Sequence, residues 1–403
     1  MEKNLKLYGK IVGNDVINKI YSKAKKFSGK HIICISSTYQ GGGVAEILNS
    51  VVPLFNEIGI ELGWRTLNGS PDFFTVTKKF HNALQGERIN LSKRKKEIYY
   101  ETNKRFSNFT HIDHDLVVIH DPQPLPLVEF YRKAQPWIFR CHIDLTSPNP
   151  EVWDYLKKII AQYDHMIVSK KDYIKNDLEI PQSVIYPAID PLSIKNKPIS
   201  RSTISKYLNK FEISEDKPII SQISRFDKWK DPIGVVKVFE VVRKKINSQL
   251  VLLGSIAPDD PEGQKIFEDV KKAVEKNRFK KDIKVLLVNS EILVNSLQRA
   301  SSVVIQKSLR EGFGLVISET LYKGTPVVAS NVGGIPLQII NGVNGFLHSP
   351  KDIEGFSRSI IKIMKDEKMR DMLGKNGRIH VKNNFLITRL IDDWLDIFEK
   401  HLI

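Results

Sequence analysis

Short runs of apolar, often β-branched residues alternate with longer amphipathic stretches along most of the chain. This alternation is typical of α/β domains with parallel sheets, because each strand is followed by a helix that crosses back over the sheet. In the first half the predicted strands are 31–36, 116–120, 138–142 and 165–168. In the second half they are 219–223, 249–253, 283–288, 302–306 and 326–329.

The same pattern predicts two helices with clear boundaries. After Gly43, apolar residues recur at near-helical spacing until Gly59. At the C-terminus, a helix over 386–403 places an apolar stripe on one face, formed by Leu390, Trp394, Leu395, Ile397, Phe398 and Leu402. This stripe must be buried against another element. The stretch 66–110 is polar and rich in lysine, and its pattern assigns no element.

A segment rich in Pro, Ser and Lys, residues 180–218, separates the two alternating series. We therefore expect two Rossmann-like domains, over 1–195 and 196–385, with the helix 386–403 packing back on the first. Two such domains imply a cleft between them. Ligands of parallel sheets bind at the carboxyl ends of strands, so the polar motifs directly after the strands are the candidates for chemistry.

Composition and charge narrow this picture only slightly. The 403 residues are too many for one compact core, and 41% hydrophobic with 27% charged residues is ordinary for a globular protein. These values exclude a disordered chain and a disulfide scaffold. The net charge of +16 favours anionic partners, but a lysine-rich solvated surface accounts for it equally well, and no nucleic-acid-reading motif is present.

The two cysteines, Cys34 and Cys141, lie in apolar stretches and form no CxxC pattern. We expect both to be buried free thiols. No apolar run approaches the roughly 18–20 residues of a membrane span, and the N-terminus has no apolar signal core. The sequence therefore predicts a soluble, cytoplasmic protein.

A glycine-rich loop, 36–43, follows the first predicted strand. Its glycines Gly41, Gly42 and Gly43 allow the backbone to approach a ligand and direct N–H groups toward an anion or a sugar. The loop is neither GxGxxG nor a Walker loop, which disfavours a nicotinamide dehydrogenase. An ordinary turn remains the alternative interpretation.

Two histidines follow later strands of the first half. His120 and Asp121 come directly after one strand, and His142 after another, where such side chains can hold hydroxyl groups near a reacting centre. A structural role for either histidine stays open. His111, Asp113 and His114 match no common ligand spacing, so no metal site is predicted.

The second half contributes charged motifs. Arg225 and Lys230 lie between a strand and a helix, where they could clamp a diphosphate, although a solvated basic turn would look the same. Glu311 precedes a turn whose amides, at Gly312, Phe313, Gly314 and Leu315, are suited to phosphate, and Glu319 lies on the helix that begins there. Carboxylates accept hydrogen bonds from sugar hydroxyls. The arrangement therefore predicts a nucleotide sugar, while surface glutamates on an ordinary helix remain the alternative.

The E-x7-E pair, Glu311 and Glu319, with SRFDKWK before it and VGGIP after it, resembles retaining glycosyltransferase family 4 with the GT-B fold. The resemblance spans most of 31–385. The segments STYQGGGVAEIL, FFTVTKKFHNALQG, HDPQP and WIFRCHID are similar to the trehalose glycosyltransferring synthases of that family.

The resemblance implies a GT-B α/β fold with an acceptor domain followed by a nucleotide-sugar donor domain. It implies a retaining glucosyltransferase that forms α,α-trehalose from UDP-, ADP- or GDP-glucose and free glucose and releases the nucleoside diphosphate. No metal or further cofactor is implied, and the partners would be these sugars rather than nucleic acid or membrane. A homodimer is left open.

It also implies roles for individual residues. Glu311 would hold hydroxyls of the donor glucose, Glu319 the ribose, and Arg225 and Lys230 the diphosphate, assisted by the amides of residues 312–315. His142 would lie against the donor sugar at the reacting carbon, and the loop with Gly41, Gly42 and Gly43 would reach toward donor and acceptor. The acceptor glucose would be seated by Asp121, His81, Asn82 and Gln85.

One departure from the family pattern is Asp231, which follows Lys230 where many relatives have glycine. This sequence therefore keeps the cation of Lys230 but loses a flexible turn. Three alternatives remain open at this point. They are a trehalose phosphorylase, a family-4 transferase with a lipid or phosphosugar acceptor, and a noncatalytic protein that binds nucleotides or nucleic acid.

Overall fold

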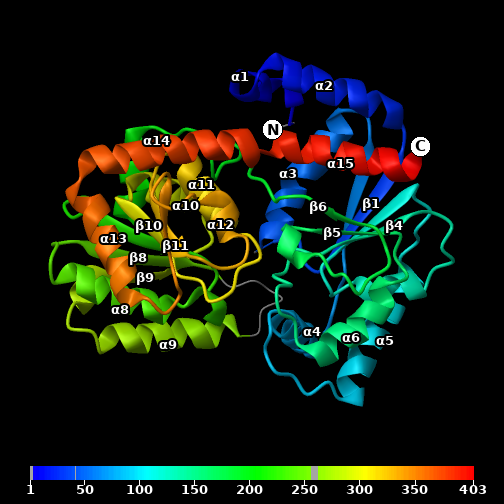
Figure 1. The fold of residues 1–403 in the computed structure, drawn as a ribbon, viewed down its shortest axis with the longest axis horizontal. Coiled ribbons are helices and arrows are strands. Elements are labelled where there is room, and N and C mark those ends of the chain that lie inside the picture. Colours follow the sequence, from blue (N-terminus) through cyan, green and yellow to red (C-terminus); the bar gives the residue numbers. More distant parts are fainter. Residues whose placement is uncertain (1–2, 41, 256–261) are drawn as a thin grey trace. The chain divides into compact units, whose positions relative to one another are not determined.

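The computed structural model describes residues 3–40, 42–255 and 262–403, which divide into two compact units (Figure 1). Unit 1 comprises residues 3–188 and 387–403, and unit 2 comprises 189–386, in each case within the described range. Each unit contains a six-stranded parallel sheet.

The sheet of unit 1 has the strand order β2-β1-β3-β4-β5-β6. Its strands are β1 (His31–Ser36), β2 (Glu61–Thr66), β3 (Leu116–His120), β4 (Trp137–Arg140), β5 (His165–Val168) and β6 (Gln182–Val184). The chain first adds β2 on one side of β1 and then β3 on the other, so the strand order reverses between β1 and β3. The carboxyl ends of these two strands therefore flank a crevice of the kind that binds ligands in open α/β sheets.

The helices of unit 1 are α1 (Gly9–Val12), α2 (Asn14–Ala24), α3 (Gly43–Glu57), α4 (Pro71–Leu84), α5 (Lys93–Phe109), α6 (Pro150–Ile160) and α15 (Ile387–Leu402). Helices α4 and α5 fill the stretch 66–110, which the hydrophobic pattern left unassigned. Both begin at serine caps, Ser70 and Ser92, that accept a backbone hydrogen bond from the first turn. In α5 the buried side chains are Tyr99 and Asn103 alone, so the helix carries too narrow an apolar stripe to be recognised by periodicity.

The C-terminal helix α15 packs on α2 and α3, and Figure 1 shows it running beside α2. The ring of Phe398 lies 6.1 Å from that of Phe27 and 5.4 Å from that of Phe55. Of the predicted apolar stripe, all residues are buried except Leu402, which is partly exposed. A ladder of ion pairs also joins α2 and the following turn to α15: Lys19–Asp392, Lys23–Asp392, Lys23–Asp396 and Lys26–Glu399.

The sheet of unit 2 has the order β12-β11-β10-β7-β8-β9. Its strands are β7 (Ile219–Ile223), β8 (Gln249–Gly254), β9 (Ile283–Leu287), β10 (Val303–Gln306), β11 (Val327–Ser330) and β12 (Gly345–His348). The helices are α7 (Arg201–Lys210), α8 (Pro232–Arg243), α9 (Gly263–Glu275), α10 (Glu291–Ala300), α11 (Leu315–Tyr322), α12 (Ile335–Gln338), α13 (Ile353–Lys365) and α14 (Glu367–Asn384). Here the strand order reverses between β7 and β10, which places the expected ligand crevice at their carboxyl ends.

The nine strands predicted from the sequence are all present, four with the predicted bounds and five with ends shifted by one or two residues. The largest difference is β4, which was predicted to reach His142 but ends at Arg140. The cause is local, because the backbone N–H of His142 donates to the carboxylate of Asp121 (2.7 Å) instead of extending the sheet. Both cysteines are buried and free, as predicted. None of the helices in the described part of the chain is both long and apolar enough to cross a bilayer.

Candidate active site

The centre of the site in unit 2 is an ion pair between Lys230 and Glu311. Lys230 ends η5 (Lys228–Lys230), a short helix after β7, and Glu311 lies in the loop after β10. Their side chains meet at 2.5 Å, with the Lys230 side chain 17% exposed and that of Glu311 8%. Because β7 and β10 are adjacent, the pair lies at the reversal of strand order. The structure therefore brings together two residues that the sequence placed 81 positions apart.

Two further side chains from the end of β10 hold the same carboxylate. Gln306 Nε2 and Ser308 Oγ each donate to Glu311 Oε2 at 3.2 Å. Three donors therefore converge on one oxygen of Glu311. Its orientation is fixed before any substrate binds, which is what electrostatic catalysis requires.

The turn after Glu311 leads directly into α11. Gly314 adopts φ 84°, a left-handed conformation, and a Cβ at this position would press against the side chain of Glu311. No side chain caps the helix, which begins at Leu315. Gly312 and Phe313 complete the turn. The start of α11 therefore presents backbone N–H groups beside Glu311, a suitable arrangement for a phosphate.

A second glycine turn, at Gly334, packs against the turn that follows Glu311. Gly334 packs directly on the backbone of residues 312–313, where a Cβ would clash, and its N–H donates to Glu311 O. Gln338 then donates to Phe313 O and accepts hydrogen bonds from the backbone and hydroxyl of Ser318. The loop that carries the candidate phosphate site is therefore braced from α11 and α12.

Asp231 preserves the turn after Lys230, although many relatives have glycine at this position. It adopts φ 46° and ψ 52°, the left-handed conformation that glycine would take most easily, so the turn is kept without glycine. Its carboxylate caps α8 by accepting from Gly234 N (3.0 Å) and also pairs with Lys307, whose side chain is only 3% exposed. These contacts offset the unfavourable backbone and fix the position of Lys230.

Glu319 lies on α11 and is 3% exposed. Its Oε2 accepts a hydrogen bond from Gln298 Nε2 (3.0 Å), and its Oε1 lies 3.5 Å from Lys195 Nζ. Arg225 follows β7 and is partly buried in the segment that leads to η5. The remaining member of the predicted set, Leu315, is the first residue of α11.

In unit 1 an uncharged pair of histidines lies at the carboxyl ends of β3 and β4, beside the reversal of strand order between β1 and β3. His120 Nδ1 lies 3.1 Å from His142 Nε2, and the rings are stacked at 5.4 Å. Burial, with the nearby positive charge of Arg140, lowers the pKa of His120 to about 3 and holds that of His142 well below its ordinary value. Both imidazoles are therefore neutral at physiological pH.

Asp121 is bonded to the backbone next to this pair and helps to position it. It adopts φ 63°, and its backbone N–H donates to Arg140 O (2.9 Å) while its carboxylate accepts from His142 N. The end of β3 is thereby joined to the end of β4. The structure brings Asp121, His120 and His142 into one cluster.

The other predicted residues of unit 1 lie on neighbouring helices. Gly42 is the extended N-cap of α3 and Gly43 its first residue, while Gly41 lies outside the described residues. Asn82 and Gln85, at the end of α4, are 2% and 6% exposed, and His81 is partly exposed. Helix α4, which carries these residues at its end, packs on α5 and α6.

Several residues at the site were not found from the sequence. Gln306 ends a predicted strand and Lys307 and Ser308 directly follow it, so their position could have indicated them. Lys195 and Gln298 carry no such signal, because they reach Glu319 only through the packing of the segment before α7 and of α10. Within the described residues no group of three or more His, Cys, Asp or Glu side chains is arranged to hold a metal ion.

Two parallel α/β sheets, each with polar residues at its reversal of strand order, are the architecture of GT-B glycosyltransferases. A UDP-forming α,α-trehalose-phosphate synthase from Burkholderia xenovorans superposes with a TM-score of 0.74 over 93% of this chain and all of its own, at 15% identity. The chain thus has the GT-B fold.

Comparison of sequences defines the family. Residues 34–175 match the model "Trehalose synthase, N-terminal domain" and residues 203–380 match "Glycosyl transferases group 1". The trehalose synthase of Thermococcus litoralis is 43% identical over 98% of this chain and 96% of its own length. The trehalose phosphorylase of Grifola frondosa is 29% identical over 93% of this chain, which covers only 58% of that protein. The chain belongs to the trehalose synthase family of glycosyltransferases.

Proposed function

We propose that the protein transfers glucose from a nucleoside-diphosphate glucose to free glucose, forming α,α-trehalose with retention of configuration at the donor carbon. The observation that supports this most directly is the Lys230–Glu311 pair beside the open N-terminus of α11. It places a cation and backbone amides next to an oriented carboxylate, which matches a ligand with phosphate next to sugar hydroxyls.

In the proposed reaction the bond between the donor C1 and the diphosphate oxygen breaks, and a bond forms between C1 and a hydroxyl oxygen of the acceptor. The electron pair leaves with the diphosphate, and the acceptor's proton is taken up by the departing phosphate. Lys230, Arg225 and the amides at the start of α11 stabilise the negative charge that develops there. Glu311 holds hydroxyls of the donor glucose, and Glu319 holds those of the ribose.

Unit 1 supplies the sugar-facing groups in this proposal. His142 lies against the donor glucose, and Asp121 with His81, Asn82 and Gln85 seats the acceptor. Such neutral or hydrogen-bonding groups suit hydroxyls, whereas the charged groups of unit 2 suit phosphate. The cation set of unit 2 makes a metal ion unnecessary for this transfer.

A trehalose phosphorylase is the second candidate, because a curated relative carries that name. The full-length chain, incubated with free glucose and in turn with UDP-, ADP- and GDP-glucose, should form trehalose and release the matching nucleoside diphosphate. Trehalose incubated with inorganic phosphate should give no glucose 1-phosphate. Phosphate-dependent cleavage without nucleotide-dependent synthesis would reject the proposal and favour the phosphorylase.

A further inference from the structure

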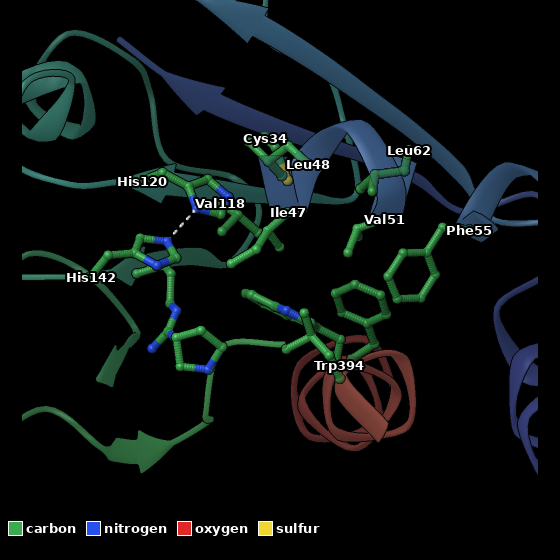
Figure 2. A pocket seen from close by; sticks show the side chains of 14 residues that line it. Cys34, Ile47, Leu48, Val51, Phe55, Leu62, Val118, His120, His142 and Trp394 are labelled. Atoms are coloured by element: carbon green, nitrogen blue, oxygen red, sulfur yellow. Dashed lines mark hydrogen bonds between the residues drawn. The ribbon is translucent and has the colours of Figure 1, made fainter. Parts of the chain in front are cut away.

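A small cavity lies beside the histidine pair in unit 1 (Figure 2). Its walls are mostly apolar and come from β1, β2, β3, α3 and α15, with Val51, Phe55 and Trp394 among them. Three polar side chains complete the lining: His120, Arg140 and His142. The volume of about 20 Å³ is enough for a single water molecule, which needs roughly 10–15 Å³ on the same measure.

Two of these polar side chains have a nitrogen without a partner. Arg140 is 2% exposed; its Nη2 donates to Ser169 Oγ (3.1 Å) and Ile185 O (2.8 Å), but within the described residues Nη1 has no acceptor. His120 is 4% exposed, and its Nε2 is also unpartnered in the described part of the chain. A buried polar atom left unpaired costs about 1–3 kcal/mol, so a shared partner would stabilise both.

We propose that this cavity binds one structural water, which accepts a hydrogen bond from Arg140 Nη1 and donates one to His120 Nε2. We further propose that this water fixes which ring nitrogen of His142 carries the proton. Arg140 and His120 are then positioning residues for His142. The role of His142 toward the sugar rests on the proposed function.

The direction of the hydrogen bonds follows from the chemistry of the groups. A guanidinium can only donate, so the water must turn its oxygen toward Arg140. One of its hydrogens then points to His120 Nε2, which must be unprotonated. Since His120 is neutral, its proton is on Nδ1 and is donated to His142 Nε2, 3.1 Å away. His142, also neutral, must therefore carry its proton on Nδ1.

The opposite direction is less favourable for two reasons. If His120 carried its proton on Nε2, the water would accept from both side chains, and its hydrogens would face apolar walls without an acceptor. In addition, the N–H of His120 would point toward the positive charge of Arg140, an unfavourable arrangement of charge and dipole. Both effects favour the series of hydrogen bonds from Arg140 through the water and His120 to His142, in which His142 carries its proton on Nδ1.

The consequence for the site is a histidine with a fixed donor. His142 is partly exposed, whereas His120 is buried. The ring nitrogen of His142 that His120 does not engage is then a hydrogen-bond donor, suited to an oxygen of the donor sugar. The apolar cavity under α15 thus determines the polarity of a group at the reacting centre.

Nitrogen-15 NMR of the full chain with labelled histidine measures the tautomer directly. At pH 7 in the absence of substrate, His142 should show the Nδ1–H tautomer and His120 likewise. Observation of the Nε2–H tautomer at either residue would overturn the proposal. This measurement needs no turnover, so it is independent of the proposed function, which fails separately if the wild-type protein makes no trehalose.

Two variants of His120 test the positioning role. In His120→Asn the amide nitrogen can take the place of Nδ1 and donate to His142, whereas His120→Leu cannot donate. We expect His120→Leu to lower kcat by about 10–100-fold with little change in KM, the scale seen when a group that orients a ligating histidine is lost. His120→Asn should recover most of this loss. Equal losses in both variants would show that His120 has only a packing role. If neither variant folds, the tautomers measured by NMR in the wild-type protein decide whether the proposal holds.

The occupant of the cavity is tested by crystallography of the wild-type protein. A water within hydrogen-bond distance of Arg140 Nη1 and His120 Nε2 is the expected result. In crystals grown with bromide, an anomalous peak in the cavity would show that an anion binds there instead. Since an anion cannot donate to His120, that result would overturn the proposal.

Discussion

The two units use the same sheet reversal for opposite kinds of chemistry. In unit 2 the crevice between β7 and β10 holds a charged pair, Lys230 and Glu311, both with limited exposure. In unit 1 the ends of β3 and β4, beside the reversal between β1 and β3, hold two histidines whose charge has been removed by burial and by Arg140. Shared topology determines where a ligand binds, and the side chains placed there determine which part of it is recognised.

The difference in charge has a physical consequence for each crevice. Preorganised charges stabilise a leaving group whose own charge grows during the reaction. Neutral donors and acceptors discriminate hydroxyl groups without the large desolvation cost of an ion. The predictions below change one crevice at a time, from the largest expected effect to the smallest.

Glu311→Ala should lower kcat/KM for trehalose formation by about 100–1000-fold, because it removes the oriented carboxylate and leaves Lys230 without its partner. Steady-state kinetics of nucleoside-diphosphate release measure the effect. Glu354→Ala, which removes an exposed glutamate of the same unit, is the control and should retain activity. If Glu311→Ala folds and its turnover is undiminished, the charged crevice is not the catalytic one.

Lys230→Ala should lower kcat by about 100-fold and also weaken binding of the nucleotide sugar, since one cation would serve both the bound diphosphate and the departing one. Kinetics with the donor as the varied substrate separate the two effects. Lys237→Ala removes an exposed lysine of α8 and is the matched control. Unchanged kinetics in Lys230→Ala would remove this residue from the site.

Lys307→Met tests the support beneath the charged crevice. Asp231 would lose its buried partner while still capping α8, and we expect the free energy of unfolding to fall by about 2–3 kcal/mol. Denaturant unfolding measures this value. A stability equal to that of the wild type would show that the Lys307–Asp231 pair contributes no net stabilisation.

The neutral crevice predicts a particular response to pH. The unfolded chain takes up protons on its histidines below pH 6.5, whereas folded His120 does so only near pH 3. The free energy of unfolding should therefore fall as the pH drops below 6.5, by about 1.4 kcal/mol per pH unit for each such histidine. His120→Asn should remove one histidine's share of that slope, as measured by unfolding at a series of pH values.

Lys23→Ala should have the smallest effect, about 0.5–1 kcal/mol, because its ion pairs between α2 and α15 are partly exposed. Burial acts to raise the pKa of Asp392, but hydrogen bonds from Lys19 and Lys23 outweigh it and hold the pKa below its ordinary value. Their contribution is present above the ordinary pKa and is lost as the pH falls through the lowered one. The effect of Lys23→Ala should also shrink in 1 M salt, and a loss independent of salt would point to packing instead.

Much of the fold could be read from the sequence because its strands are short, apolar and bounded by polar residues. β1, β3, β5 and β7 have the predicted bounds. Helix α5 was missed because its single narrow contact surface leaves almost no apolar stripe. The short strand β6 was hidden in a segment that looked like a linker, since all three of its residues are only partly buried.

The candidate site was predicted in part for the same reason. Glu311, Lys230 and His142 stand directly after or near strand ends, where topology gathers ligand-binding groups. Lys195 and Gln298 could not be found this way, because their contacts with Glu319 arise only when the segment before α7 and helix α10 pack beside α11. Whether His81, Asn82 and Gln85 seat the acceptor stays a prediction.

The sequence by itself determined the class of fold, the strand ends at which ligand-binding groups gather and the residue types available there, because these follow from local periodicity and short-range position. Only the tertiary structure decided the state of those residues. Burial beside Arg140 makes the histidines neutral, convergence of Gln306, Ser308 and Lys230 orients Glu311, and Lys307 with the cap of α8 stabilises Asp231 in a glycine-like turn. Each of these three features depends on groups that are distant in the sequence and come together only when the chain folds.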